Sequence, residues 1–341
     1  MLETSETWQR FTRDAEQAIV EDTKCHHDSK LSIANWLNSG AFVLTNAVNN
    51  CYSAEIDRQD FSSALVSEAE ALLDHVAELR AQVYECRRLG QELWSSPAWL
   101  LVTCYYWCFF ACEAILRLVG RPISYLGAQE SRRLGILAGV NSFGKGAYYF
   151  VPQRVISLTK AGYSICRDDL RIHESVWQRF GDYLIAHFAG RKDNTLSKVD
   201  LGFKRSLGFV PNPNGSRWMS AFRNNVNYKL FFGFGAVLKE TNIDLIKYLR
   251  RQDGMTLEDA LEESVLIQTL ISGDTDNVSS AGSYARLCYV NAVILTSCAE
   301  KLRVHIGDRT KGVTLWHTNR HKFLESRVSH GKPSYHWPIR V

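Results

Sequence analysis

Hydrophobic positions recur at helical spacing along most of this chain. The clearest stripe covers 61–89, where apolar side chains return every three or four residues, the period of one helix face. A second long stripe covers 284–306, and a helix is also predicted over 172–189. Shorter helical patterns cover 3–24 and 28–50 near the N-terminus. The hydrophobic pattern therefore predicts a mainly α protein.

The segment 97–120 is almost entirely apolar and ends in a Gly-Arg-Pro triplet, which stops a helix. Only about fifteen residues precede its first charge, fewer than the roughly twenty that a membrane span needs. Its charged residues, Glu113 and Arg117, lie four apart and can pair on one helix face. The segment is therefore interpreted as a buried central helix, which forms an antiparallel hairpin with 61–89.

The segment 121–215 has a different character. Four glycines lie within 135–146, and the runs 148–151 and 154–158 are rich in aromatic and β-branched residues, so short strands or irregular loops are expected. Further helices are predicted over 216–240, 242–251 and 256–271. The predicted organisation has N-terminal helices (1–58), a helical bundle (59–120 and 216–306), an insertion (121–215) and a basic, His-rich tail (307–341).

Composition adds only weak constraints on function. With 40 Lys and Arg against 36 Asp and Glu, the net charge of +4 neither implies nor excludes a nucleic-acid partner. The 9 cysteines are an odd number in a chain without a secretory leader, which indicates reduced thiols and a cytoplasmic protein. No CxxC pair occurs, so a structural zinc is not expected. No cofactor, metal or membrane association is predicted.

Two patterns, one of glycines and one of cysteines, have simple structural interpretations. Gly139-x4-Gly144-Lys145 resembles the start of a phosphate-binding loop, with 134–137 as the strand before it. However, Gly146 replaces the Ser or Thr that would hold Mg²⁺, and no helix is predicted to follow, so nucleotide binding is not favoured. Cys104, Cys108 and Cys112 share one helix face among aromatic residues and are interpreted as buried hydrophobic side chains.

A histidine-containing pattern lies in the C-terminal tail. His317, His321 and Glu325 have a spacing that metal sites use on helices. They lie among basic residues that repel cations, and no HExxH motif is present. A solvated face, in contact with nucleic acid or a partner, is the favoured interpretation.

The segment 216–240 contains the only candidate site. Arg223 and Asn227 lie four apart and share a helix face, with Tyr228 about 140° around the axis from Arg223. A structural interpretation makes this cluster a hydrogen-bonded plug between helices. The functional alternative is that Arg223 binds a phosphate while Asn227 or Tyr228 positions a ribose hydroxyl.

Two motifs resemble those of the HEPN superfamily of helical-bundle proteins. The stretch 104–116, CYYWCFFACEAIL, is similar to the family's aromatic helix, and 223–228, RNNVNY, resembles its R-x4-6-H motif in a variant form. The resemblance implies an antiparallel helical bundle covering under half of the chain. It also implies a prokaryotic antiviral or toxin-type system, in which such proteins are RNases or subunits of protein complexes.

The candidate motif departs from the catalytic members of that family. Those members cut RNA without metal, using an Arg and a His from two protomers, whereas Tyr228 stands in the His position here. A phenol with a pKa near 10 is a poor base at neutral pH. His173, His187 and His305 are other histidines that would have to reach the site from elsewhere in the chain.

Two functions remain open from the sequence. The first is a non-catalytic or weakly catalytic HEPN-like subunit, which binds other subunits of a defence complex or forms a homodimer and also contacts RNA. The second is a metal-independent endoribonuclease with Arg223, Asn227 and Tyr228 as its catalytic residues.

Overall fold

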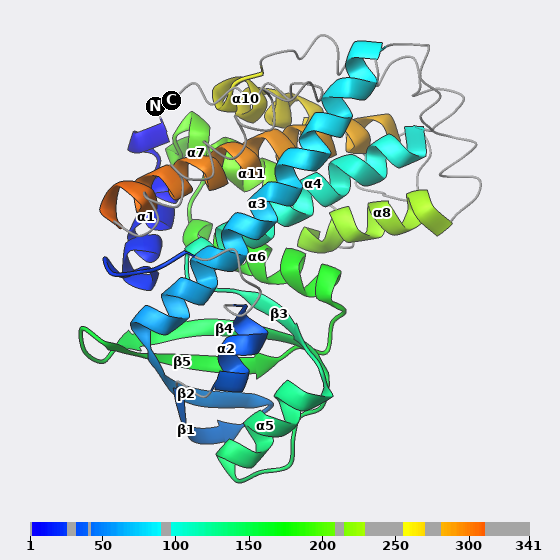
Figure 1. Ribbon diagram of the computed structural model, residues 1–341. Coiled ribbons are helices and arrows are strands. Elements are labelled where there is room, and N and C mark those ends of the chain that lie inside the picture. The colour runs from blue at the N-terminus through cyan, green and yellow to red at the C-terminus, as the bar shows by residue number, and fades with distance from the viewer. Residues whose placement is uncertain are drawn as a thin grey trace, which may run out of the picture.

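A bundle of helices stands on one side of a small antiparallel β-sheet (Figure 1). The computed structural model describes residues 2–25, 32–39, 42–89, 97–208, 215–228, 255–269 and 281–310 of the 341. The predicted mainly α fold is confirmed for this part of the chain, and the sheet is an addition to it.

Three long helices form the centre of the bundle. These are α3 (Arg58–Leu89), α4 (Pro97–Leu118) and α11 (Ala281–Arg309), and α4 packs against both of the others. The predicted hairpin of α3 and α4 is present. By length and composition α4 could cross a membrane, but 78% of its apolar window is buried inside the protein. Its apolar surface is therefore covered by neighbouring helices.

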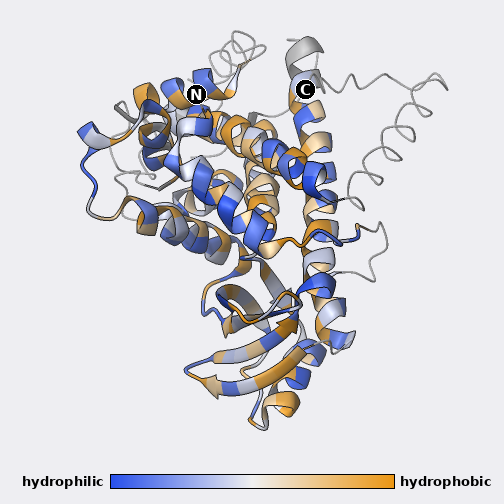
Figure 2. Ribbon diagram, turned by 90° about the vertical axis from the view of Figure 1, so that its left-hand side faces the viewer, coloured by the Kyte–Doolittle hydropathy of each residue, from blue (hydrophilic) through white to orange (hydrophobic). Residues whose placement is uncertain are grey.

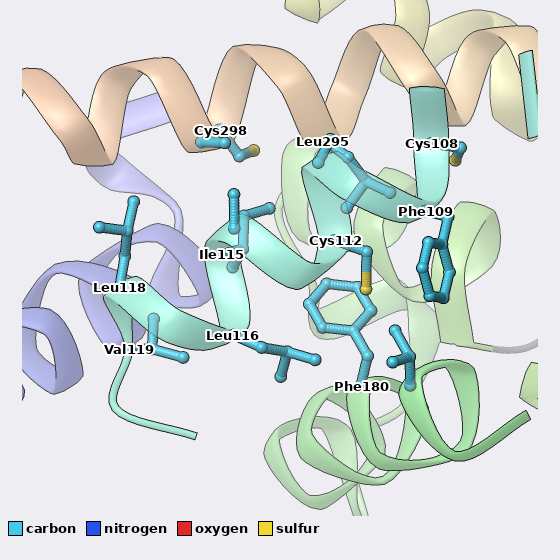
Figure 3. Close-up of a cluster of buried hydrophobic side chains, with 14 of the residues drawn as sticks. Cys108, Phe109, Cys112, Ile115, Leu116, Leu118, Val119, Phe180, Leu295 and Cys298 are labelled. Atoms are coloured by element: carbon cyan, nitrogen blue, oxygen red, sulfur yellow. The ribbon is translucent and has the colours of Figure 1, made fainter. Parts of the chain in front are cut away.

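The core around α4 shows why its cysteines are inert. In Figure 3, Cys108 and Cys112 lie with Phe109, Phe180 and Leu295, between α11 and α6 (Ile172–Phe188). Burial raises the pKa of both thiols well above their ordinary value, so they stay protonated. The prediction that these cysteines are buried hydrophobic side chains is confirmed.

A buried charge network ties the end of α4 to its neighbours. Arg117 Nε lies 2.6 Å from Glu68 Oε2 on α3, and Arg117 Nη2 donates to the carbonyl of Ile123. Arg117 also pairs with Glu113 on its own helix, as the sequence predicted. Because both charges are almost fully buried, each depends on the other for compensation.

The sheet has the strand order β1-β2-β5-β4-β3. Its strands are β1 (Phe42–Val48), β2 (Cys51–Asp57), β3 (Ile123–Leu126), β4 (Gly146–Val155) and β5 (Lys160–Arg167), and all neighbours pair antiparallel. Hydropathy changes repeatedly along the strands in Figure 2, as expected for a sheet with one covered face. The strands expected in 121–215 are thus present.

The prediction of a helix over 28–50 was wrong beyond Ser39, where α2 (Ile33–Ser39) ends. The chain then forms the β1–β2 hairpin, which turns at Asn49 and Asn50 with φ of 52° and 62°. Asparagine accepts these left-handed angles more readily than most residues, and two such residues in a row favour a hairpin turn. Strand β2 pairs with β5, so the sheet joins the N-terminal region to the insertion.

The expectation that all cysteines are reduced thiols was also wrong. Cys51 on β2 and Cys166 on β5 are direct cross-strand partners and form a disulfide. In the described part of the chain, Cys108, Cys112, Cys288 and Cys298 are free thiols.

The other helices surround this framework. Thr256 and Asp259 form reciprocal capping contacts at the start of α10 (Leu257–Thr269), which confirms the helix predicted from residue 256. The remaining elements are η1 (Leu2–Thr4), α1 (Glu6–Ala18), α5 (Ala128–Ala138), η4 (Asp193–Thr195), α7 (Lys198–Phe203), η5 (Lys204–Gly208), η6 (Gly215–Arg217), α8 (Trp218–Tyr228) and α10 (Leu257–Thr269). Three predicted parts lie outside the described residues. These are the helix over 242–251, the end of the helix over 216–240 and the tail beyond 310.

The glycine pattern at 139–145 does not form a phosphate-binding loop. The segment 134–137 is helical, within α5, and Gly139 with φ of 66° ends that helix. Strand β4 begins directly after Lys145, so no helix N-terminus follows the glycines to face a phosphate.

Candidate functional site

Arg223 lies where α8 packs against α4 and α6. One face of α8 is buried through Met219, Phe222 and Val226, whose three- and four-residue spacing is that of a helix packed along one side. Arg223 borders this face and is half-buried. The packing of the apolar side chains therefore sets the position of the guanidinium.

Among the described residues, the guanidinium of Arg223 forms hydrogen bonds only with uncharged groups. Its Nη2 donates to Tyr106 Oη on α4 at 2.7 Å, and its Nη1 donates to Asn224 Oδ1 at 3.0 Å. Its Nε is buried and has no hydrogen-bond partner in the part of the chain that the structure describes. Within the described residues, no carboxylate forms an ion pair with Arg223. A half-buried cation without a counter-charge favours the binding of an anion.

The other predicted site residues lie at the surface. Asn227 is exposed one helical turn beyond Arg223, and Tyr228 is 73% exposed. The Tyr228 ring is 5.8 Å from Arg223 Cζ, within the range of a cation–π contact. Asn225, in contrast, is buried and fits the structural interpretation of a polar plug. The cluster is thus divided between a buried side and an open side.

Tyr106 and His173 complete the site, and neither was predicted as a site residue. His173, near the start of α6, has its ring centroid 5.8 Å from that of Tyr106 and 4.4 Å from that of Phe109. Its Nδ1 lies 3.1 Å from Tyr105 Oη, which also accepts a hydrogen bond from Trp177 Nε1. No spacing along the sequence indicated this contact, because 50 residues, which include most of α6 and all of α7, separate His173 from Arg223.

The electrostatics of the site keep His173 uncharged. Burial, with a further contribution from the positive charge of Arg223, lowers the pKa of His173 from 6.5 to about 4. Burial raises the pKa of Tyr105, so its hydroxyl stays protonated at neutral pH. The site therefore combines a cation with a neutral imidazole and the protonated phenol of Tyr105.

The other two histidines considered from the sequence lie elsewhere. His305 on α11 contacts Glu16 at 2.9 Å, and the His187 ring lies edge-on to the Phe188 ring at the end of α6. In the described residues, no cluster of three or more His, Cys, Asp or Glu side chains has the arrangement of a metal site. The residues His317, His321 and Glu325 lie outside that part of the chain.

Comparison with protein-family models, with curated proteins and with solved structures finds no match to this chain. The arrangement of side chains around Arg223 therefore gives the available information on its chemistry. A guanidinium beside an open aromatic surface suits a phosphate joined to a planar base. The neutral imidazole adds a group that can take up a proton.

Proposed function

We propose that this chain is an RNA-binding, HEPN-like subunit of a prokaryotic antiviral or toxin-type system. In this proposal Arg223 binds a phosphate group of the RNA. One observation carries it: the guanidinium is half-buried, meets only neutral groups in the described part of the chain, and has a buried Nε without a partner. The resemblance of 104–116 and 223–228 to the HEPN motifs supplies the proposed setting.

The helical surroundings of Arg223 support this proposal. Both resembling motifs lie on helices, α4 and α8, and the two helices touch through Tyr106 and Arg223. Motifs that are 117 residues apart along the chain therefore belong to one site. A guanidinium binds phosphate through paired N–H donors, which a lysine does not offer.

A separate surface suits the proposed contact with partner proteins. The turn of the β4–β5 hairpin exposes Val155, Ile156 and Leu158, the last of them 89% exposed. Several apolar side chains gathered on a surface turn are typical of an interaction site. We expect Leu158→Asp to reduce recovery of a co-expressed partner subunit while leaving RNA binding unchanged.

RNA binding is tested by comparing the wild-type protein with Arg223→Gln and Arg223→Lys. Loss of one phosphate contact lowers affinity and reduces the slope of log K against log salt by about one. Arg205→Gln is a matched control, because Arg205 already pairs with Asp193 at 3.0 Å. Wild-type protein that binds no RNA, or an Arg223→Gln variant with unchanged affinity and salt slope, would refute the proposal.

The second candidate function is a metal-independent endoribonuclease, and the position of His173 favours it. An uncharged imidazole can accept the proton of a ribose 2′-OH, whose oxygen then attacks the adjacent phosphorus. The 5′ oxygen leaves with a proton from solvent as the 2′,3′-cyclic phosphate forms, and Arg223 stabilises the charge on the phosphate oxygens. Asn227 and Tyr228 would then orient the ribose.

The two functions are separated by incubating the protein with RNA in EDTA. Cleavage that is lost in both Arg223→Gln and His173→Gln identifies the nuclease. RNA that stays intact while it binds to the wild-type protein, and binds less to Arg223→Gln, identifies the binding subunit.

A further inference from the structure

An exposed line of aromatic side chains runs along α4 beside Arg223. Trp99, Tyr106 and Phe110 are separated by seven and four residues, so they share one face of the helix, with Thr103 between the first two. Trp99 is 69% exposed, and Tyr106 and Phe110 are half-buried. Apart from Ala98, which is partly buried, the other described side chains of α4 are buried, which makes this line its open face.

Helix α8 brings a further aromatic ring to the same surface. Met219 Sδ lies 3.8 Å from Cys108 Sγ, and Arg223, one turn later, contacts Tyr106. Helix α8 therefore runs antiparallel to α4 here, and its last residue, Tyr228, lies toward the Trp99 end of the line. Arg223 sits between Tyr106 and Tyr228, with its Cζ 5.6 Å and 5.8 Å from the two ring centroids.

We infer that this surface, formed by Trp99, Tyr106, Phe110 and Tyr228 around Arg223, binds single-stranded RNA by stacking unpaired bases. The inference rests on the proposed phosphate binding by Arg223 and specifies the form of the RNA. Aromatic faces alternating with a cation are the usual means of holding a single strand, because each base offers a flat surface and each nucleotide a phosphate. The bases of a duplex are already stacked and cannot use these rings.

The dimensions of the surface suit a short stretch of RNA. From Trp99 to Phe110 the helix rises about 16 Å at 1.5 Å per residue, enough for on the order of three bases, one at each ring. At the Phe110 end, the ring of His75 lies 5.3 Å away, and His75 pairs with Glu78 at 3.7 Å. The carboxylate of Glu78 is 73% exposed and repels phosphate, so it marks the limit of the surface.

The test uses an unstructured RNA of about 15 nucleotides and an abasic ribose-phosphate strand of equal length. We expect Trp99→Ala and Tyr228→Ala each to weaken binding of the RNA roughly 5- to 100-fold, the usual effect of losing one stacked base, and to leave abasic binding unchanged. Arg223→Gln should weaken binding of both strands. Tyr125→Ala is the control, since Tyr125 is 56% exposed on β3, which follows the end of α4 opposite to Trp99.

Each result distinguishes the stacking inference from the proposed function. If the wild-type protein binds RNA and the abasic strand equally, or if Trp99→Ala and Tyr228→Ala leave RNA binding unchanged, the stacking inference is wrong and the phosphate site stands. If the wild-type protein binds neither strand, both proposals are wrong. Glu78→Gln, which removes the repelling charge, should strengthen RNA binding and leave the fold intact, since Glu78 is exposed.

Discussion

Arg223 on α8 and Tyr106 on α4 share a hydrogen bond of 2.7 Å across 117 residues of sequence. This contact fixes the guanidinium at the edge of the aromatic line on α4 and within range of His173, whose pKa it lowers. A single side chain thus links the three helices around the site.

Tyr106→Phe removes the hydroxyl that accepts the hydrogen bond from Arg223 and leaves the ring in place. We expect the free energy of unfolding to fall by about 1 kcal/mol, the usual net value of such a bond, as measured by urea denaturation. Tyr125→Phe is the control, since that side chain is exposed and its change should stay within about 0.5 kcal/mol. Equal effects of the two variants would contradict the assigned role of the Tyr106 hydroxyl.

His173 should titrate far below an ordinary histidine, with a pKa of about 4 by NMR. Arg223 contributes to this shift, so Arg223→Gln should raise the pKa of His173. Binding of phosphate or RNA to Arg223 should raise it as well, because the bound anion offsets the positive charge. A His173 pKa that is unaffected by either change would show that the two residues are not electrostatically coupled.

The same shift predicts how stability depends on pH. Between the unfolded pKa of 6.5 and the folded pKa of about 4, the unfolded chain binds a proton that the folded protein does not. Stability should therefore fall as the pH decreases through this window, and the His173 contribution becomes constant below it. His173→Gln should show a shallower decrease between pH 6.5 and 4.

Arg117→Met leaves the buried carboxylate of Glu113 without its partner. Removal of one member of a buried ion pair costs about 3 to 5 kcal/mol, and chemical denaturation measures this loss. Burial raises the pKa of Glu113, and the loss of Arg117 would raise it further. The cost should therefore shrink as the pH falls toward 4.5, where Glu113 becomes protonated in both states.

A matched control for Arg117→Met is Arg80→Met. Arg80 pairs with Glu300 at 3.4 Å, and that carboxylate is 42% exposed to solvent. Solvent screens such a pair, so its removal should cost at most about 1 kcal/mol. A similar loss for the two variants would show that Glu113 and Glu68 do not depend on Arg117.

The Cys51–Cys166 disulfide closes a loop with a sequence separation of 115 residues. Replacing both residues by serine should lower the free energy of unfolding by about 2 to 4 kcal/mol, because the unfolded chain gains freedom. A reducing agent should destabilise the wild-type protein by a similar amount and leave the double variant unchanged. Thiol alkylation in denaturant provides a direct check, since reduction should expose two additional thiols.

Local sequence signals predicted the helical framework well. The stripe at 61–89 became α3, the Gly-Arg-Pro triplet marked the end of α4, and Thr256 with Asp259 marked the start of α10. Each of these signals depends on side chains within a few residues of one another, so it can be recognised along the chain. The face of α8 that presents Arg223 was predictable for the same reason.

The sequence alone therefore determined the long helices, the buried character of α4 and the position of Arg223 on a helix beside Asn227 and Tyr228. Only the tertiary structure decided that 42–57 forms a hairpin, since β2 is stabilised by pairing with β5 more than a hundred residues later. It also decided that Tyr106 contacts Arg223 and that His173 lies close enough for the Arg223 charge to lower its pKa. Such contacts depend on how separate elements pack, and no spacing along a single sequence specifies that packing.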